Sequence, residues 1–116
     1  MEELIAWINP RCSKCRGLVA LLKASGKDYQ LREYLEDPPS VAELQQALVA
    51  LGTNDPHMLV RRKESIYSEL GLAEASPEVL LEALAAHPNL LERPVLFAGD
   101  RAMVARPPEK ANELLN

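Results

Sequence analysis

Two cysteines are the residues best suited to chemistry in this 116-residue sequence. Cys12 and Cys15 stand three positions apart, between an apolar run and a stretch with helical periodicity, which predicts that Cys12 lies at a helix N-terminus. Unpaired backbone N–H groups and the positive end of the helix dipole stabilise a thiolate there. The neighbouring cations Arg11, Lys14 and Arg16 add to this effect, so Cys12 is the candidate nucleophile.

The same helix start can hold an anion, because its backbone N–H groups point outward. Nucleophile and anion site then coincide, which favours transfer chemistry on a tetrahedral oxyanion or on another sulfur. Cys15 lies one helical turn on and can form a disulfide with Cys12, and the very short loop favours a redox role over a structural one. Two alternatives stay open: a zinc half-site, although His57 and His87 stand at no standard spacing, and a pair of inert cysteines.

Composition excludes several classes of protein. The net charge is −4, from 13 Lys and Arg against 17 Asp and Glu, and aromatic residues make up 4%, so neither a basic face nor a base-stacking platform for nucleic acid is expected. Two closely spaced cysteines do not fit a secreted disulfide scaffold. The acidic start Met1-Glu2-Glu3 and the short apolar run at 4–8 fit neither a signal peptide nor a membrane span. We expect a cytoplasmic protein with reduced thiols.

The two ends of the chain carry the pattern of strands. Residues 4–8 form an apolar run that stops at Asn9-Pro10, residues 14–25 have helical spacing up to Gly26, and residues 29–34 alternate as a second strand. This order predicts a right-handed crossover between parallel strands. Near the C-terminus, residues 94–98 and 101–105 predict a hairpin around Gly99-Asp100, followed by a helix from Pro107-Pro108 that turns Leu114 and Leu115 inward.

The middle of the chain is helical in character. Ser40 and Glu43 form a capping box ahead of a helix that ends at Gly52, and Ser76-Pro77 begins another helix that runs to about His87-Pro88. Residues 38–90 therefore indicate a helical subdomain inserted between β-containing ends. The length fits one domain over residues 1–116.

The sequence contains four further patterns, in which h is an apolar residue. They are N-P-x-C at residues 9–12, hhRxKExxYxELGL at 59–72, HPxLhxRPhhh at 87–97 and xxRPPE at 105–109. In this order they resemble the arsenate reductases that work with glutathione and glutaredoxin, a family that includes the Spx transcription regulators. The match covers nearly the whole chain. The resemblance implies an α/β fold: a thioredoxin-like mixed four-stranded sheet with a helical insertion subdomain.

The resemblance also implies three arginines that surround the catalytic Cys12 and bind the oxyanion: Arg61, Arg93 and Arg106, with Arg62 as an alternative to the first. Guanidinium groups suit tetrahedral oxyanions and stay charged at any working pH. For each arginine the alternative is a solvated surface charge.

Further residues belong to the expected site or to its surroundings. Pro94 would be the cis-proline beside the active cysteine, and Arg11 is a fourth candidate for binding the substrate. Three apolar or aromatic residues of the second block are expected in the core: Tyr67, Leu70 and Leu72.

Two positions depart from the reductase pattern. Ile8 stands where many of these reductases carry a His, and Cys15 stands where they typically carry Ser, whereas Spx regulators have C-x-x-C. The leading interpretation is a monomeric thiol oxidoreductase without a metal or bound cofactor, which reduces arsenate or a similar oxyanion with glutathione and glutaredoxin or thioredoxin. The alternatives are a redox-sensing regulator that uses a Cys12–Cys15 disulfide and a protein partner, and an enzyme with the same chemistry on another substrate.

Overall fold

The computed structural model describes residues 3–115, so the acidic Met1-Glu2 lies outside the described part. The chain divides into two compact units. The first comprises Met1–Asp37 together with Arg93–Asn116, and the second comprises Pro38–Glu92. Between residues 3 and 115, no helix is long and apolar enough to span a bilayer.

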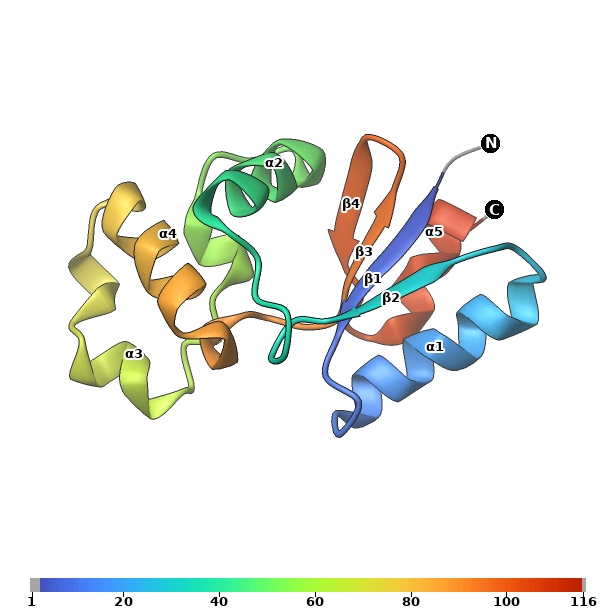
Figure 1. Ribbon diagram of the computed structural model, residues 1–116, viewed down its shortest axis with the longest axis horizontal. Coiled ribbons are helices and arrows are strands. Elements are labelled where there is room, and N and C mark those ends of the chain that lie inside the picture. Colours follow the sequence, from blue (N-terminus) through green and yellow to red (C-terminus); the bar gives the residue numbers. More distant parts are fainter. Residues whose placement is uncertain (1–2, 116) are drawn as a thin grey trace. The chain divides into compact units, whose positions relative to one another are not determined.

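The first unit contains a four-stranded mixed sheet in the order β2-β1-β3-β4 (Figure 1). Its strands and the helix that joins the first two are β1 (Leu4–Ile8), α1 (Ser13–Ser25), β2 (Gln30–Glu33), β3 (Val95–Ala98) and β4 (Arg101–Val104). β1 and β2 are parallel, whereas β3 is antiparallel to both β1 and β4. The predicted crossover, hairpin and mixed four-stranded sheet are confirmed.

The register of β1 and β3 decides what lies at each end of the sheet. Leu4 pairs with Ala98 and Trp7 pairs with Val95, so the last residues of β1 lie beside the first residues of β3. The loop that carries Cys12 follows β1 directly, and the segment that carries Pro94 leads into β3. Antiparallel pairing therefore brings these two segments to one end of the sheet.

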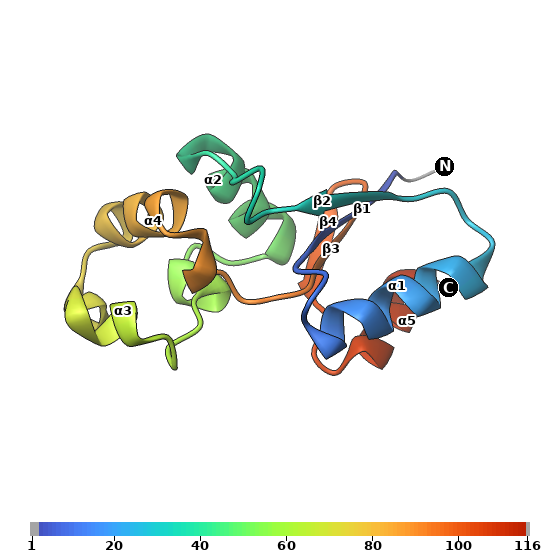
Figure 2. The same ribbon diagram turned by 60° about the horizontal axis from the view of Figure 1, so that its bottom comes forward.

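One face of this sheet is covered by helices. Successive strand side chains point to opposite faces, so Leu4, Ala6 and Ile8 share one face, where they join the buried core. α1 and the C-terminal α5 (Asn112–Leu115) both lie on that side of the sheet (Figure 2). They contribute Cys15, Leu18, Leu22 and Leu115 to the same core.

The other face carries the aromatic residues of the sheet. The rings of Trp7 and Phe97 lie 4.7 Å apart, and the Arg32 guanidinium lies 5.6 Å from the centre of the Trp7 ring. Aromatic and cation–π contacts of this kind stabilise this face of the sheet.

The second unit has its own core between α2 (Val41–Leu51) and α4 (Pro77–Ala86). The predicted capping box is present: the Ser40 hydroxyl accepts from the Glu43 N–H at 3.1 Å, and the Glu43 carboxylate accepts from the Ser40 N–H at 3.0 Å. The buried residues of these helices are Leu44, Ala47 and Leu48 on α2, and Leu80, Leu81, Ala83 and Leu84 on α4.

Short helical turns connect these two helices: η1 (Pro56–Leu59), α3 (Ser65–Glu69), η2 (Leu72–Glu74) and, after α4, η3 (Pro88–Leu90). Leu72 is buried as predicted, and Tyr67 is half-buried with its hydroxyl 3.2 Å from His57 Nε2. The expectation for Leu70 is wrong, because its side chain is 49% exposed. α3 ends at Glu69 with Leu70 as its C-cap, and none of the residues of α3 is buried, so no buried helix face leads this side chain into the core.

The buried face of α1 gives a stability test. Leu22 is fully buried, so Leu22→Ala should lower the free energy of unfolding by about 2–5 kcal/mol, through lost transfer energy and a cavity. Lys23→Ala, one exposed position along the same helix, should change it by less than about 0.5 kcal/mol. Urea denaturation followed by Trp7, the single tryptophan, measures both variants. Equal effects of the two substitutions would contradict the assigned orientation of α1.

Candidate active site at the start of α1

Cys12 occupies the N-cap position of α1, with an extended backbone at φ −86° and ψ 126°. Its N–H donates to the Asn9 carbonyl at 3.0 Å, which closes the turn after β1, and its own carbonyl accepts from the Arg16 N–H at 3.0 Å. N-cap residues usually offer a side-chain oxygen to the first helical amides. The neutral Cys12 thiol caps none of them, so these amides are available to a thiolate or a bound anion.

The surroundings of Cys12 favour its ionised form. Partial burial raises the pKa of the thiol, but hydrogen bonds from the Cys15 amide, the Arg93 side chain, the Cys15 thiol and the Lys14 amide together outweigh it. The resulting pKa is about 7, below the ordinary value. Cys12 therefore ionises more readily near neutral pH than an ordinary thiol.

Arg93 is the cation that contacts the sulfur. Its half-buried side chain hydrogen-bonds Cys12. Burial alone would lower the pKa of Arg93, but this hydrogen bond and the negative charges of Tyr34, Cys12 and Cys15 raise it above its usual range. Arg93 therefore stays charged whenever Cys12 ionises.

Arg106 holds the segment that presents Arg93. Its Nη1 donates to the Arg93 carbonyl at 2.8 Å, and the N–H of the preceding Ala105 donates to the Pro94 carbonyl at 2.9 Å. The Arg93–Pro94 peptide bond is cis, in agreement with the family resemblance. The bond between Arg106 and Pro107 is also cis, which the sequence did not indicate. Cys12, Arg93 and Arg106 thus lie in one connected network.

The cations next to Cys12 in the sequence have other contacts. Arg16 Nη1 donates to the carbonyls of Arg11 at 3.1 Å and Pro10 at 3.4 Å, so this guanidinium closes the loop. Lys14 acts on Cys12 through its backbone N–H, and the Arg11 side chain is exposed. The expected stabilisation by these three cations stays a prediction, whereas Arg93 supplies the side-chain hydrogen bond.

Cys15 is fully buried in the core beneath the site. Its Sγ accepts a hydrogen bond from the Asn9 N–H at 3.4 Å, which ties the start of the loop to α1. Burial, together with the negative charge of Cys12, raises the pKa of Cys15 to about 12, although the hydrogen bond from Asn9 lowers it. Both thiols are free, and Cys15 stays protonated near neutral pH. Its role as a resolving thiol stays a prediction.

Arg61 lies in the second unit, where its contacts are with acidic residues. Its Nη1 donates to Glu64 Oε2 at 3.1 Å, and its Nε lies 4.0 Å from Glu92 Oε1. The role of Arg61 toward Cys12 stays a prediction, as does that of the exposed Arg62. Neither carboxylate was expected from the sequence to pair with Arg61, although Glu64 stands three positions after Arg61 and Glu92 stands directly before Arg93.

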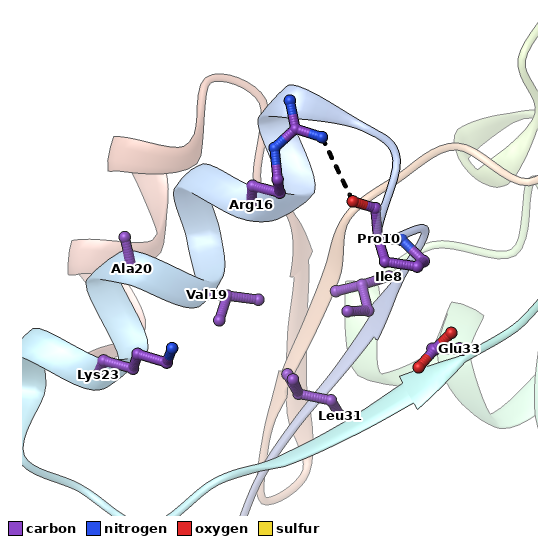
Figure 3. A pocket seen from close by; sticks show the side chains of 8 residues that line it. All are labelled: Ile8, Pro10, Arg16, Val19, Ala20, Lys23, Leu31 and Glu33. Atoms are coloured by element: carbon purple, nitrogen blue, oxygen red, sulfur yellow. Dashed lines mark hydrogen bonds between the residues drawn. The ribbon is translucent and has the colours of Figure 1, made fainter.

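A groove of about 480 Å³ runs between α1 and β2 (Figure 3). Ile8, Val19 and Leu31 line its apolar part, with Lys23 on α1 and Glu33 on β2. The other lining residues are Pro10, Arg16 and Ala20. Periodicity along one strand or helix cannot reveal such a groove, because it forms between elements that the sheet brings together. Elsewhere within residues 3–115, no three side chains of His, Cys, Asp or Glu come together as they would to hold a metal ion.

Comparison with known proteins decides the family. A sequence model of the ArsC family matches residues 7–114. The chain belongs to the ArsC family. This ArsC protein is 42% identical to the Escherichia coli K12 protein named "Uncharacterized protein YfgD", over 98% of each chain. It is 38% identical to an arsenate reductase of Neisseria meningitidis serogroup B, over 99% of this chain and 100% of that one.

A solved structure supports the same assignment. Arsenate reductase from Vibrio cholerae superposes on this ArsC protein with a TM-score of 0.93 at 39% identity, over 97% of this chain and 98% of that one. The predicted family and its thioredoxin-like α/β fold are confirmed.

The ionisation of Cys12 can be measured by alkylation with iodoacetamide. The rate should rise with pH around a midpoint near 7, because the thiolate is the reactive form. At pH 7 it should exceed the rate of a free thiol of pKa about 8.5 by about threefold, since greater ionisation outweighs lower intrinsic nucleophilicity. Cys15 should stay unmodified in the folded protein. Mass spectrometry of the alkylated peptides separates the two cysteines.

Arg93→Gln should shift the midpoint upward, because it removes the charged donor to the sulfur. Arg101→Gln is the matched control, since the register places Arg101 beside Ala98, at the opposite end of the sheet. An unchanged midpoint in Arg93→Gln, or a wild-type midpoint near 8.5, would refute the assigned stabilisation of the thiolate.

Proposed function

We propose that this ArsC protein is a thiol oxidoreductase of the arsenate reductase type, with Cys12 as its nucleophile. The observation that carries the proposal is a cysteine of pKa about 7 at the N-cap position of a helix, hydrogen-bonded to Arg93. Full-length relatives bear the name arsenate reductase, which supports arsenate as the substrate class. Ile8, in place of the histidine of many such reductases, is compatible with this chemistry because Arg93 and the helix amides already lower the pKa of Cys12.

In the proposed reaction the oxyanion binds at the start of α1, next to the Cys12 sulfur. The Cys12 thiolate attacks arsenic, a sulfur–arsenic bond forms, and an arsenic-bound hydroxyl leaves as water after taking up a proton. Two glutathione thiols then supply two electrons: they become a disulfide while arsenic(V) becomes arsenic(III), which departs as arsenite and returns Cys12 as a thiolate. Glutaredoxin or thioredoxin takes part in returning the oxidised thiols to their reduced state.

The arginines have different proposed roles in this reaction. Arg93 stabilises the thiolate and, after attack, the charge on the arsenic oxygens. Arg106 donates to the Arg93 carbonyl, so it orients that segment in addition to binding the oxyanion. Arg61 and the exposed Arg11 complete the proposed set of oxyanion-binding residues.

The position of Cys15 supports an external thiol as the reductant. A thiol that is fully buried with a pKa of about 12 is almost wholly protonated at neutral pH, so it attacks a Cys12 adduct slowly. We further propose that the chain acts as a single monomeric domain in the cytoplasm, where glutathione is abundant and thiols stay reduced. The proposal includes no bound cofactor, metal, nucleic acid or membrane.

Turnover tests the proposal directly. With glutathione, glutaredoxin and glutathione reductase present, arsenate should cause NADPH consumption, and Cys12→Ser should lower the rate by about a hundredfold or more, because the hydroxyl is not ionised at neutral pH. Arg93→Gln should lower kcat/KM, whereas Arg101→Gln should leave it within about twofold of the wild type. Replacing glutaredoxin with thioredoxin identifies the reductant.

If arsenate causes no more NADPH consumption with the wild type than with Cys12→Ser, whichever redox protein is present, arsenate is ruled out as the substrate. Cys12-dependent reduction of glutathione mixed disulfides in the same assay would then assign the third interpretation, the same thiol chemistry on another substrate.

A second candidate function is that of a redox-responsive regulator. It is favoured by the hydrogen bond between the side chains of Cys12 and Cys15, which places the two sulfurs side by side. An external oxidant would take two electrons and two protons from the thiols as the disulfide forms. Affinity capture with the oxidised and reduced protein, with Cys15→Ser as control, should retain a partner in one redox state only. Identical captured proteins in both states would exclude this function.

A further inference from the structure

A buried tyrosine follows β2 directly. Of the turn residues 34–37, only Tyr34 is buried: it is 1% exposed, whereas Leu35, next to it, is 41% exposed. The ring of a buried tyrosine contributes apolar contacts, but its hydroxyl is polar and usually has a polar neighbour. The proposed reaction does not use this hydroxyl.

Hydrogen bonds fix the turn that carries Tyr34. The N–H groups of Glu36 and Asp37 both donate to the Glu33 carbonyl, at 3.0 Å and 2.9 Å. Arg32 Nε donates to the Asp37 carbonyl at 3.0 Å and lies 3.3 Å from Asp37 Oδ2. The backbone of Tyr34 is therefore held in place from both sides of the turn.

Strand pairing brings this turn to the end of the sheet where the candidate site lies. β1 and β2 are parallel with Ile8 beside Glu33, so the turn of Tyr34 and the loop of Cys12 follow their strands at the same end (Figure 1). The antiparallel β3 begins at that end, directly after the segment that carries Arg93. The carboxyl ends of parallel strands are a common place for ligand sites in α/β proteins.

The electrostatics of Arg93 identify it as a neighbour of the Tyr34 hydroxyl. Burial lowers the pKa of Arg93, but its hydrogen bond to Cys12 and negative charge on Tyr34, Cys12 and Cys15 raise it above its ordinary value. Because an interaction between charges weakens with distance, the phenolic oxygen lies near the guanidinium. Arg93 therefore interacts with both Cys12 and Tyr34.

Arg93 needs more than one contact to keep its orientation. A guanidinium has five N–H donors on a long side chain with several rotatable bonds, so one hydrogen bond to Cys12 leaves it free to turn. Arg106 fixes the backbone of Arg93 through its carbonyl, at 2.8 Å. A phenolic oxygen can accept a hydrogen bond from a guanidinium N–H.

We propose that Tyr34 is a positioning residue for Arg93, whose hydroxyl oxygen accepts a hydrogen bond from the guanidinium and holds it toward the Cys12 sulfur. This inference rests on the proposed function, in which Arg93 stabilises the Cys12 thiolate. Tyr34 acts on the reaction through Arg93 and makes no contact with the substrate.

Tyr34→Phe tests the proposal, because it keeps the ring and removes the hydroxyl. The midpoint of Cys12 alkylation by iodoacetamide should rise by about 0.3 to 1 pH unit, since a less well oriented Arg93 stabilises the thiolate less. The value of kcat/KM for arsenate should fall by about two- to tenfold. Urea denaturation followed by Trp7 verifies that the variant is folded.

Tyr29→Phe is the matched control. Tyr29 is a half-buried tyrosine of the same unit, and it precedes β2 at the end of the strand opposite to Cys12. This variant should leave both the alkylation midpoint and kcat/KM unchanged. A loss of ring packing alone would not move the midpoint, so the readout separates positioning from a structural role.

A double-mutant cycle with Arg93→Gln shows whether Tyr34 acts through Arg93. In the Arg93→Gln background, Tyr34→Phe should cause no further shift of the midpoint. An equal shift in both backgrounds would overturn the proposal, because the hydroxyl would then act on Cys12 without Arg93. An unchanged midpoint in Tyr34→Phe would overturn it as well, and so would a lower one, which would mean that the hydroxyl competes with the thiolate for Arg93.

The alkylation experiment does not require turnover, so its outcome is separate from that of the proposed function. A raised midpoint in Tyr34→Phe without arsenate-dependent NADPH consumption by the wild type supports the role of Tyr34 and rejects arsenate as the substrate. Turnover with an unchanged midpoint in Tyr34→Phe supports the reductase and rejects the role of Tyr34.

Discussion

The contact between the Cys12 sulfur, the first amides of α1 and the Arg93 side chain is the interaction on which the site depends. Helix dipole and guanidinium act on the same atom, and together they overcome the burial that would otherwise keep the thiol protonated. The other contacts of the first unit serve this arrangement. Arg106 holds the carbonyl of Arg93, and Cys15 accepts a hydrogen bond from Asn9 beneath the loop.

Strand pairing is what makes the contact possible. Cys12 and Arg93 lie near opposite ends of the sequence, and the antiparallel pairing of β1 with β3 brings their segments to the same end of the sheet. The helical unit is inserted between β2 and β3 and takes no part in the pairing of β1 with β3. Each unit has its own apolar core.

Local patterns in the sequence were sufficient for most of the fold. Apolar runs, the Ser40 capping box and the Gly26 helix end depend on neighbours within a few positions, and the structure contains all of them. Cys12 was recognised for the same reason, because its surroundings at the helix start are local. The family pattern was needed for Arg93, since its contact with Cys12 depends on strand pairing. The contact of Glu92 with Arg61 was missed because it results from packing between segments distant in sequence. Glu64, three positions after Arg61, and the burial of Cys15, at helical spacing from Leu18 and Leu22, were missed although both signals are local.

The N-cap position of α1 also connects reactivity to folding. The pKa of Cys12 is lower in the folded protein than in an unfolded chain, so the thiolate stabilises the fold at pH values above the free-thiol pKa, and this contribution is lost as the pH falls through about 7. A serine at this position would cap the helix at every pH, and N-cap residues of this kind typically contribute about 1 kcal/mol. Selection for stability alone would therefore favour serine over cysteine at this position, so a cysteine here is consistent with the proposed role of Cys12 as nucleophile.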